Sequence, residues 1–268
     1  MTYLFILLSA LSAVPDKDLH EKCLYPTVMI VGEKPKTIGS GVIVKSEKIK
    51  ESEEYESYVI TCAHILIPQK AAIMPQSEAA PANFPADGEI VQNNPIPPPN
   101  PQYKNQIRVG IYENWSTLVG VKEYPCEVLF TDREKDTALI RFKSQSKMPV
   151  AEIDKKPALF IGNDVLKVGC GLGEPFRIDY GKITSVKNSI GNMIKGTYRI
   201  SAPTIMGDSG GPVFHENKVI GVSQALRNAS FGTIPETPLK TNVPITHMVY
   251  VVPIETFLET PEIAKYIK

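Results

Sequence analysis

Apolar and polar positions alternate along most of this chain in short runs, many of them β-branched, with turn-forming residues between them. Such runs fit strands better than helices, which need longer segments with a period of about 3.6 residues. So many short strands with turn signals between them predict an all-β protein, built as a barrel or a sandwich. The predicted strands are 27–31, 41–44, 58–61, 107–111, 127–130, 138–142, 167–169, 182–186, 198–201, 219–222 and 248–252.

Two segments interrupt this pattern. Residues 45–57 are largely Lys and Glu, which predicts a solvated loop between strands. Residues 66–105 hold nine prolines, three of them consecutive at 97–99. Because proline donates no ladder hydrogen bond, we expect a surface insertion here. It is either a passive loop or a lid or docking segment for a partner.

The two ends of the chain differ from the middle. Residues 1–13 contain an apolar run followed by small residues, which indicates a signal peptide and a secreted or periplasmic protein. The alternative is a buried N-terminal strand or helix in a cytoplasmic protein. No other stretch is apolar enough to span a membrane. Residues 253–267 predict a C-terminal α-helix, because Pro253 can open it and Ile254, Phe257 and Leu258 form a helical stripe.

The composition narrows the partners. Lys plus Arg and Asp plus Glu number 29 each among 268 residues, so net charge draws the chain neither to nucleic acid nor to an acidic membrane. The length suits one large all-β domain or two barrels. No Cys-x-x-Cys or Cys/His metal spacing occurs. Disulfides and buried free thiols are both open for the four cysteines, which are Cys23, Cys62, Cys126 and Cys170.

The segment from Gly207 to Val213, Gly-Asp-Ser-Gly-Gly-Pro-Val, is the sharpest chemical signal. A serine nucleophile needs a tight turn that exposes its hydroxyl, and N–H groups beside it that stabilise an oxyanion. Glycines on both sides of Ser209 permit such a backbone. We therefore expect Ser209 to be the nucleophile and the N–H groups of Gly207 and Ser209 to form the oxyanion hole.

The same residues match the G-x-S-x-G pattern of α/β-hydrolases, so the motif alone does not choose a fold. That fold needs an acid and then a histidine after the serine, with a helix directly behind it. Here Pro212 and a short strand follow instead, and the downstream histidines, His215 and His247, have no recognisable setting. Chain order therefore favours partners upstream of Ser209.

Upstream, His64 ends an apolar strand, which can hold a general base rigidly. A lone histidine is more often a surface or core residue. The third partner should be a buried carboxylate that orients the imidazole. Asp136 lies at the mouth of the apolar strand 138–142, whereas its competitor Asp132 is followed by charged residues and fits a solvated turn. We therefore expect His64 and Asp136 to complete a triad with Ser209.

With these residues assigned, the chain resembles the trypsin-like serine peptidases, and most closely the protease domain of the HtrA/Deg type. The resemblance runs from about residue 26 to 259 and depends on several blocks in one order. The blocks are Gly-Ser-Gly-Val-Ile-Val at 39–44, Thr-Cys-Ala-His at 61–64, 127–130, 136–140, 168–176, 181–185, the Ser209 block, 219–221 and 251–253.

This resemblance implies two antiparallel six-stranded β-barrels, with the active site in the cleft between them. Residues 14–150 would form the N-terminal barrel, which carries His64 and Asp136. Residues 151–268 would form the C-terminal barrel with Ser209 and the terminal helix. The chain departs from HtrA enzymes in its proline-rich insertion, in the lack of sequence for a PDZ domain after Lys268, and in Asp208, where that family usually has asparagine.

Asp208 raises the question of zymogen activation. In the digestive relatives this aspartate pairs with a new N-terminus at Ile-Val-Gly, and Ile30-Val31-Gly32 occurs here. The distance to the block at Gly39 is too short for that role, and Met29 offers no basic cleavage site. We therefore expect 27–31 to be the first barrel strand and predict activity without cleavage at Ile30.

The sequence thus predicts a serine endopeptidase that acts on polypeptides through an acyl-enzyme, without metal or organic cofactor. The alternatives are a catalytically silent protease-fold binding or chaperone module, and a processing protease for one partner. Oligomeric state stays open. No acid occupies the expected specificity pocket, so a small or medium apolar side chain should precede the cleaved bond. The expected pocket residues are Pro203, Thr204, Ser223, Ala225 and Tyr250.

Overall fold

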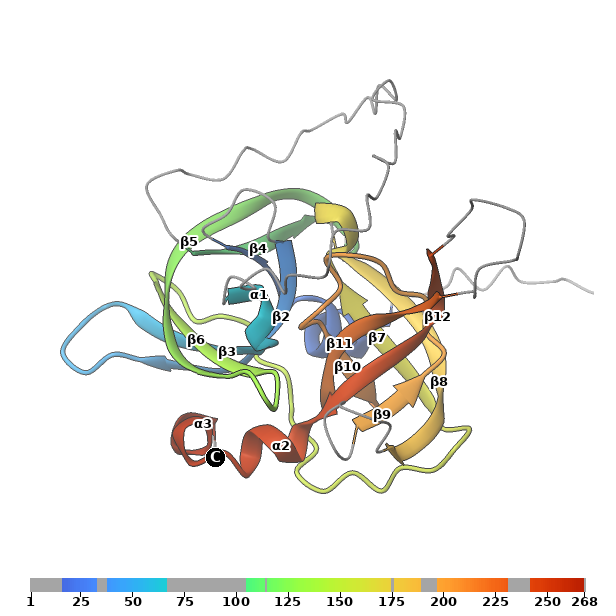
Figure 1. The fold of residues 1–268 in the computed structure, drawn as a ribbon. Coiled ribbons are helices and arrows are strands. Elements are labelled where there is room, and N and C mark those ends of the chain that lie inside the picture. Colours follow the sequence, from blue (N-terminus) through green and yellow to red (C-terminus); the bar gives the residue numbers. More distant parts are fainter. Residues whose placement is uncertain are drawn as a thin grey trace, which may run out of the picture.

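A computed structural model shows a protein of two β-barrels that lie side by side (Figure 1). It describes residues 16–32, 38–66, 105–113, 115–174, 176–188, 197–230 and 242–267, with only the backbone at 187–188, 225–230 and 242–248. The predicted signal peptide at 1–13 and nearly all of the proline-rich insertion lie outside the described residues. Both therefore stay predictions.

The first barrel closes in the order β1-β2-β3-β6-β5-β4, and every neighbouring pair of strands is antiparallel. A short π-helix, η1 (Leu19–Leu24), precedes it, and α1 (Ala63–Leu66) follows β3 directly. Its strands are β1 (Thr27–Val31), β2 (Ile38–Lys48), β3 (Tyr55–Thr61), β4 (Gln106–Glu113), β5 (Thr117–Asp132) and β6 (Thr137–Ser144).

The second barrel closes in the order β10-β11-β12-β9-β8-β7, again with antiparallel neighbours. The short 3-10 helix η2 (Gly171–Gly173) follows β7. Its strands are β7 (Asp164–Gly169), β8 (Arg177–Asn188), β9 (Thr197–Ile200), β10 (Pro212–His215), β11 (Lys218–Ser230) and β12 (Asn242–Pro253). Two closed six-stranded barrels confirm the predicted fold class.

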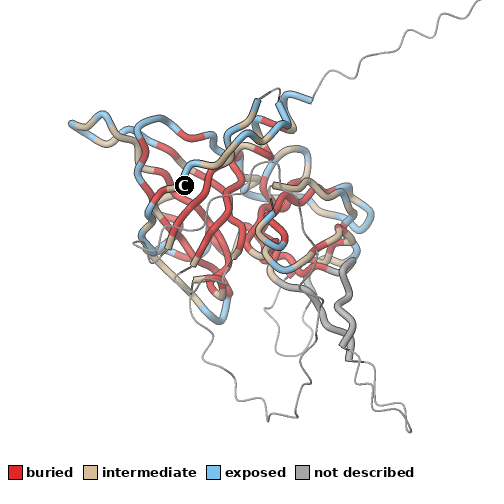
Figure 2. The backbone as a smooth tube through the Cα atoms, turned by 90° about the horizontal axis from the view of Figure 1, so that it is seen from above, coloured by how far each residue is buried: buried red, intermediate tan, exposed pale blue. Residues whose placement is uncertain are grey.

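Apolar side chains that alternate along the strands fill both barrels, and the buried backbone runs through the centre of each in Figure 2. One cluster lies inside the second barrel, with Val165, Val213 and Val249 among its members. A larger cluster joins the first barrel to one face of the second, from Ile43 and Ile60 to Val168, Phe214 and Val222. The barrels therefore share an apolar interface, and side chains at that interface can be held from both sides.

The prediction of a solvated loop over 45–57 is wrong for residues 45–48 and 55–57, which are strand. β2 and β3 extend into it as a hairpin in which Lys45 pairs with Tyr58 and Lys48 with Tyr55. Ion pairs join Lys45 to Glu47 and Lys48 to Glu53. Charged residues suit such a hairpin because it projects from the barrel, so its side chains stay solvated while its backbone groups pair.

The C-terminal helix predicted over 253–267 is two short helices, α2 (Ile254–Leu258) and α3 (Pro261–Ile267). The break falls at Thr260, directly before Pro261. Proline disfavours the helical conformation of the residue before it and is well accepted at the first position of a new helix. The apolar stripe is nevertheless buried as predicted, with Ile254, Phe257 and Ile263 fully enclosed.

The predicted strand 27–31 has the bounds of β1, and Ile30 pairs with Gly39 and Ile107 inside the first barrel. The other ten predicted strands fall within longer ones, apart from Ser201, which lies beyond β9. The sequence prediction lacks β10, because its four residues are too few to show a periodicity and the first two belong to the Ser209 motif. None of the helices in the described part of the chain is long and apolar enough to cross a membrane.

Candidate active site

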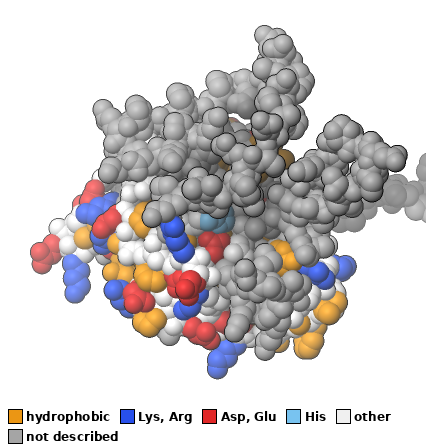
Figure 3. Space-filling model, viewed as in Figure 1, with side chains coloured by type: hydrophobic (Ala, Val, Ile, Leu, Met, Phe, Trp, Pro, Cys, Tyr) orange, Lys and Arg blue, Asp and Glu red, His pale blue; other side chains and the backbone are white. Residues whose placement is uncertain are grey.

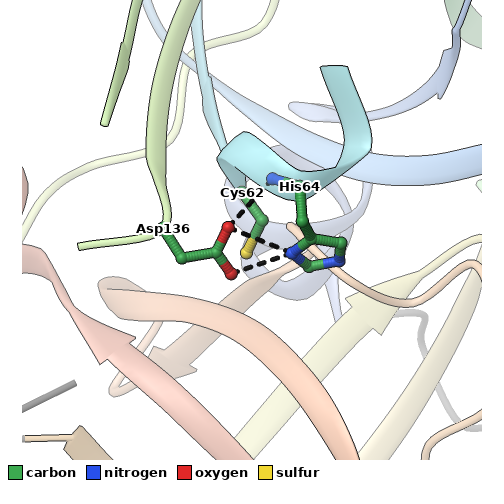
Figure 4. A group of neighbouring side chains, drawn as sticks. All are labelled: Cys62, His64 and Asp136. Atoms are coloured by element: carbon green, nitrogen blue, oxygen red, sulfur yellow. Dashed lines mark hydrogen bonds and ion pairs between the residues drawn. The ribbon is translucent and has the colours of Figure 1, made fainter. Parts of the chain in front are cut away.

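His64 and Asp136 are joined directly at one end of the first barrel (Figure 4). His64 lies on α1, two residues beyond the buried Cys62, and Asp136 lies in the tight β5–β6 turn with φ of 50°. The imidazole Nδ1 is 2.8 Å from Asp136 Oδ2 and 3.0 Å from Oδ1. The backbone N–H of His64 also donates to Oδ1 over 2.9 Å. An ionised carboxylate only accepts, so it favours the tautomer with hydrogen on Nδ1, which leaves Nε2 free to accept a proton.

Burial differs between these two side chains. The Asp136 side chain is 9% exposed and that of His64 is 33% exposed. The carboxylate is therefore fixed in the protein while the imidazole reaches solvent and any bound substrate. The competing acid, Asp132, accepts hydrogen bonds from the backbone of Glu134 and Lys135 at 2.9 and 3.0 Å. Asp132 therefore caps its own turn. Among the described residues, it makes no hydrogen bond to His64.

The Ser209 turn lies against the segment that carries His64. The Ser209 carbonyl accepts from the backbone N–H of Ser40 in the first barrel over 2.8 Å. At the next residue, Gly210, φ is 81°, and a Cβ atom would lie 2.1 Å from Thr61 Oγ1 and 2.9 Å from Ile65 Cδ1. Residues 61 and 65 flank His64 in sequence. Only glycine therefore lets the two barrels approach this closely beside the nucleophile.

The Ser209 hydroxyl donates to the carbonyl of Gln224 on β11 over 3.0 Å. Within the described residues it makes no hydrogen bond to His64. In the absence of substrate, the Ser209 side chain thus adopts a rotamer that directs its hydroxyl at Gln224. Rotation about χ1 would direct the hydroxyl elsewhere. Catalytic hydrogen bonds are often long or misaligned before substrate binds.

The backbone N–H groups of Gly207 and Ser209 point away from the protein interior. In a trans peptide the C=O and N–H groups point in opposite directions. The carbonyl of Met206 accepts from Leu172 N over 2.6 Å, and that of Asp208 accepts from Ser223 Oγ over 2.6 Å. The following N–H groups are therefore turned the other way. Within the described part of the chain, neither has an acceptor.

Ser40 fixes this turn from the opposite barrel. Its hydroxyl donates to the carbonyl of Gly207 over 2.8 Å and accepts from Cys170 N over 2.9 Å. The side chain is completely buried. Sequence reasoning placed Ser40 in a recognisable block but gave it no role. The only signal was a hydroxyl between two glycines, directly before the apolar run 42–44.

The predicted pocket residues have different surroundings. Thr204 and Ser223 are buried and contact Asp208, through its carboxylate and its carbonyl respectively. Tyr250 is also buried, and its hydroxyl has no partner among the described residues. Pro203 is half-buried. The side chain of Ala225 lies outside the described ones, although its backbone pairs with Tyr250.

Cys62 adds a thiol to the His64–Asp136 pair. The ligand atoms of these three residues all lie within 4.8 Å of one another. Figure 4 shows the three side chains together. Burial raises the pKa of the Cys62 thiol well above its ordinary value, and the nearby Asp136 adds to that effect. The thiol is therefore protonated, and it donates to the carbonyl of Ser223 over 3.4 Å.

All four cysteines are unpaired thiols in the structure, which fits the buried free-thiol alternative. Burial raises the pKa of Cys23 to about 12 and that of Cys126 to about 12. None of the four lies opposite another across a strand pair. Packing, rather than covalent links, therefore holds the barrels in this structure.

Two barrels with a histidine–aspartate pair on one and a glycine-flanked serine turn on the other define the chymotrypsin-like class of folds. Residues 39–222 match the family described as the trypsin-like peptidase domain. The chain therefore belongs to that family, as the resemblance predicted.

One solved structure, the crystal structure of Deg5, is similar over 93% of this chain and 93% of that chain, with a TM-score of 0.58 and 14% sequence identity. At that identity the likeness shows a shared fold, in agreement with the expected HtrA/Deg type. Among curated proteins, none matches the chain.

Proposed function

We propose that this protein is a serine endopeptidase with Ser209 as nucleophile, His64 as general base and Asp136 as the residue that orients His64. The observation that carries this proposal is the pairing of His64 Nδ1 with a buried carboxylate, beside a turn that carries a serine hydroxyl and two N–H groups without acceptors among the described residues. A peptidase family and polypeptide substrates accord with it.

In the proposed reaction, Ser209 Oγ bonds to the peptide carbonyl carbon while its proton passes to His64 Nε2. The N–H groups of Gly207 and Ser209 donate to the resulting oxyanion. His64 then returns the proton to the amine as the C–N bond breaks. Water repeats the sequence on the acyl-enzyme and releases the acid. Asp136 stabilises the imidazolium in both halves without taking its proton.

Ser209 must first exchange its hydrogen bond to Gln224 for one to His64. Gln224 lies on β11 and His64 on α1, so this exchange redirects the hydroxyl from the second barrel toward the first. A substrate carbonyl seated at the two N–H groups would favour this rotamer because the hydroxyl oxygen then faces the carbonyl carbon.

For specificity, the proposed pocket keeps the predicted preference for small or medium apolar side chains. Thr204 and Ser223 bring only neutral groups, and the buried Asp208 carboxylate is already neutralised by Lys167 and Arg177 at Oδ2. An arginine or lysine of the substrate would lack a free partner there. A peptide library should be cleaved after such apolar residues, and dominant cleavage after Arg or Lys would refute this.

The test of the function is labelling by a fluorophosphonate probe, read by mass spectrometry of the modified peptide. We expect labelling at Ser209 that is lost in Ser209→Ala and in His64→Ala. Ser146→Ala and His215→Ala are matched controls. Ser146 is exposed, and the His215 ring hydrogen-bonds to the Asp164 carbonyl rather than to the Ser209 turn. An unlabelled, folded wild-type protein would instead support the catalytically silent binding or chaperone module.

A further inference from the structure

A group of four charged side chains lies directly behind the Ser209 turn. We call it the buried charge cluster: Lys167, Arg177, Asp179 and Asp208. Lys167 Nζ is 2.5 Å from Asp208 Oδ2 and 3.2 Å from Asp179 Oδ2. Arg177 bridges the same two carboxylates at 3.1 and 2.9 Å. Two cations thus face two anions, and the cluster is neutral.

Lys167 is the unusual member of the cluster. It lies in the middle of β7, where it pairs with Asp179 on β8 and with Val213 on β10. Alternation places it in the same row as Val165, which belongs to the core of the second barrel. Its side chain is 0% exposed, whereas that of Arg177 is 41% exposed. An ammonium in such a place is stable only with its anionic partners.

Asp208 connects this charge to the reacting residues, since it directly precedes Ser209. Its carboxylate Oδ2 accepts from Ile205 N over 3.0 Å and from Thr204 Oγ1 over 3.3 Å, so it folds the chain before the turn back on itself. Its N–H donates to the carbonyl of Ile205 over 3.1 Å. The orientation of the following peptides therefore depends on where this carboxylate sits.

Two glycines make room for the carboxylate. A Cβ atom at Gly169 would lie 2.5 Å from Asp208 Oδ1, and one at Gly171 would lie 3.1 Å from the same oxygen. The cavity is therefore fitted to a carboxylate that is drawn inward. The cations that attract this carboxylate are Lys167 on β7 and Arg177 on β8, on the inner side of the turn. Of these two, only Lys167 is fully buried.

We propose that Lys167 is a positioning residue for the reaction at Ser209. Its ammonium holds the Asp208 carboxylate inside the second barrel and so keeps the N–H groups of Gly207 and Ser209 directed outward. Without this cation the carboxylate would gain free energy by turning toward solvent, and the turn would move with it. The inference rests on the proposed function. Under it, Lys167 supplies the cation for Asp208, so the turn reaches its active geometry without cleavage at Ile30.

The test is Lys167→Met, which keeps the length of the side chain and removes its charge. We expect kcat on a peptide substrate to fall about 100-fold, the size of effect that follows loss of one oxyanion donor, with KM within a few-fold of wild type. Circular dichroism confirms that the fold persists. The matched control is Lys182→Met, which removes an exposed lysine paired with Asp164 on the same sheet and should leave kcat unchanged.

A second variant separates positioning from general damage. Asp208→Asn removes the anion, and its amide still offers an oxygen to Ile205 N. The double variant Lys167→Met/Asp208→Asn should therefore recover at least tenfold in kcat over Lys167→Met. If Lys167→Met alone fails to fold, the double variant should still fold. Its kcat should then equal that of Asp208→Asn.

The inference is overturned if folded Lys167→Met turns over substrate like wild type. It is equally overturned if the double variant stays inactive while Asp208→Asn is active, because Lys167 would then act by another route. Failure of the proposed function gives a different result: wild-type protein that no fluorophosphonate labels and that cleaves no peptide.

Discussion

The two halves of the site are held in opposite ways. On the first barrel, His64 and Asp136 meet through their side chains, at the ends of two strands, and the imidazole is one-third exposed. On the second barrel, Ser209 is positioned by its backbone, with Ser40 on one side and the buried Asp208 on the other. On the face that Figure 3 draws, Lys and Arg lie among Asp and Glu over the described surface.

This difference suits what each half does in the proposed reaction. A general base must exchange protons with substrate, so it needs access and one oriented partner. An oxyanion hole must not reorganise during the reaction, so its dipoles have to be fixed beforehand. Side-chain contacts suffice for the first task. The second requires that the main chain itself be constrained, and a buried ion pair with hydrogen bonds from both barrels supplies that constraint.

The largest effect should come from the first half. Asp136→Asn should lower kcat about 10⁴-fold, because an amide can donate to the imidazole and favour the wrong tautomer. Stability should change little, since the side chain keeps its size. Steady-state kinetics with circular dichroism measures both. Asp132→Asn is the control, because that side chain only caps its turn. Equal losses in the two variants would contradict the assignment of Asp136.

Next, Gly210→Ala should break the contact between the halves. The added Cβ would lie 2.1 Å from Thr61 Oγ1 and 2.2 Å from the Ser40 carbonyl, at a φ of 81°. We expect a loss of about 3 kcal/mol in the free energy of unfolding and a large loss of activity. Urea denaturation tests this against Gly120→Ala, whose Cβ would meet its nearest atom at 4.0 Å. Similar unfolding midpoints for both variants would show that the barrels do not need this close approach.

A smaller effect is expected from Ser40→Ala, which leaves the Gly207 carbonyl and Cys170 N without their partner. Stability should fall by about 1 to 3 kcal/mol, and kcat should fall about tenfold because the turn is less constrained. The matched variant is Ser57→Ala, which removes a buried hydrogen bond to Ser46 within the first barrel. It should lose stability without losing kcat. If both variants keep wild-type kcat, the support from the opposite barrel is unnecessary.

The smallest effect concerns the thiols. Burial raises the pKa of Cys62 well above its ordinary value and that of Cys126 to about 12. Thiols of the unfolded chain ionise above about pH 8.5 while these stay protonated. The free energy of unfolding should therefore fall gradually as pH rises from about 8.5 toward 12. Denaturation at pH 7 and 9.5 measures this, and iodoacetamide should leave native Cys62 unmodified at both. Rapid modification of the folded protein would contradict the burial of the thiol.

The sequence by itself determined the local elements and the candidate chemistry. Short apolar and β-branched runs are local patterns, so β1 and the inner parts of most other strands were predictable. The glycines around Ser209 and the apolar strand before His64 are likewise local patterns. The C-terminal stripe was found, but the break before Pro261 was not, because the apolar pattern continues across it.

The tertiary structure decided which distant groups meet. Lys167 and Asp208 are separated by 41 positions, and Ser40 and Gly207 by 167. A lysine in an apolar strand carries no sign in the sequence of the carboxylate that neutralises it. Closure of each barrel fixes which strand ends and turns become neighbours. Since burial strengthens charge interactions and makes an unpaired charge costly, that closure also decides which charges can act on Ser209.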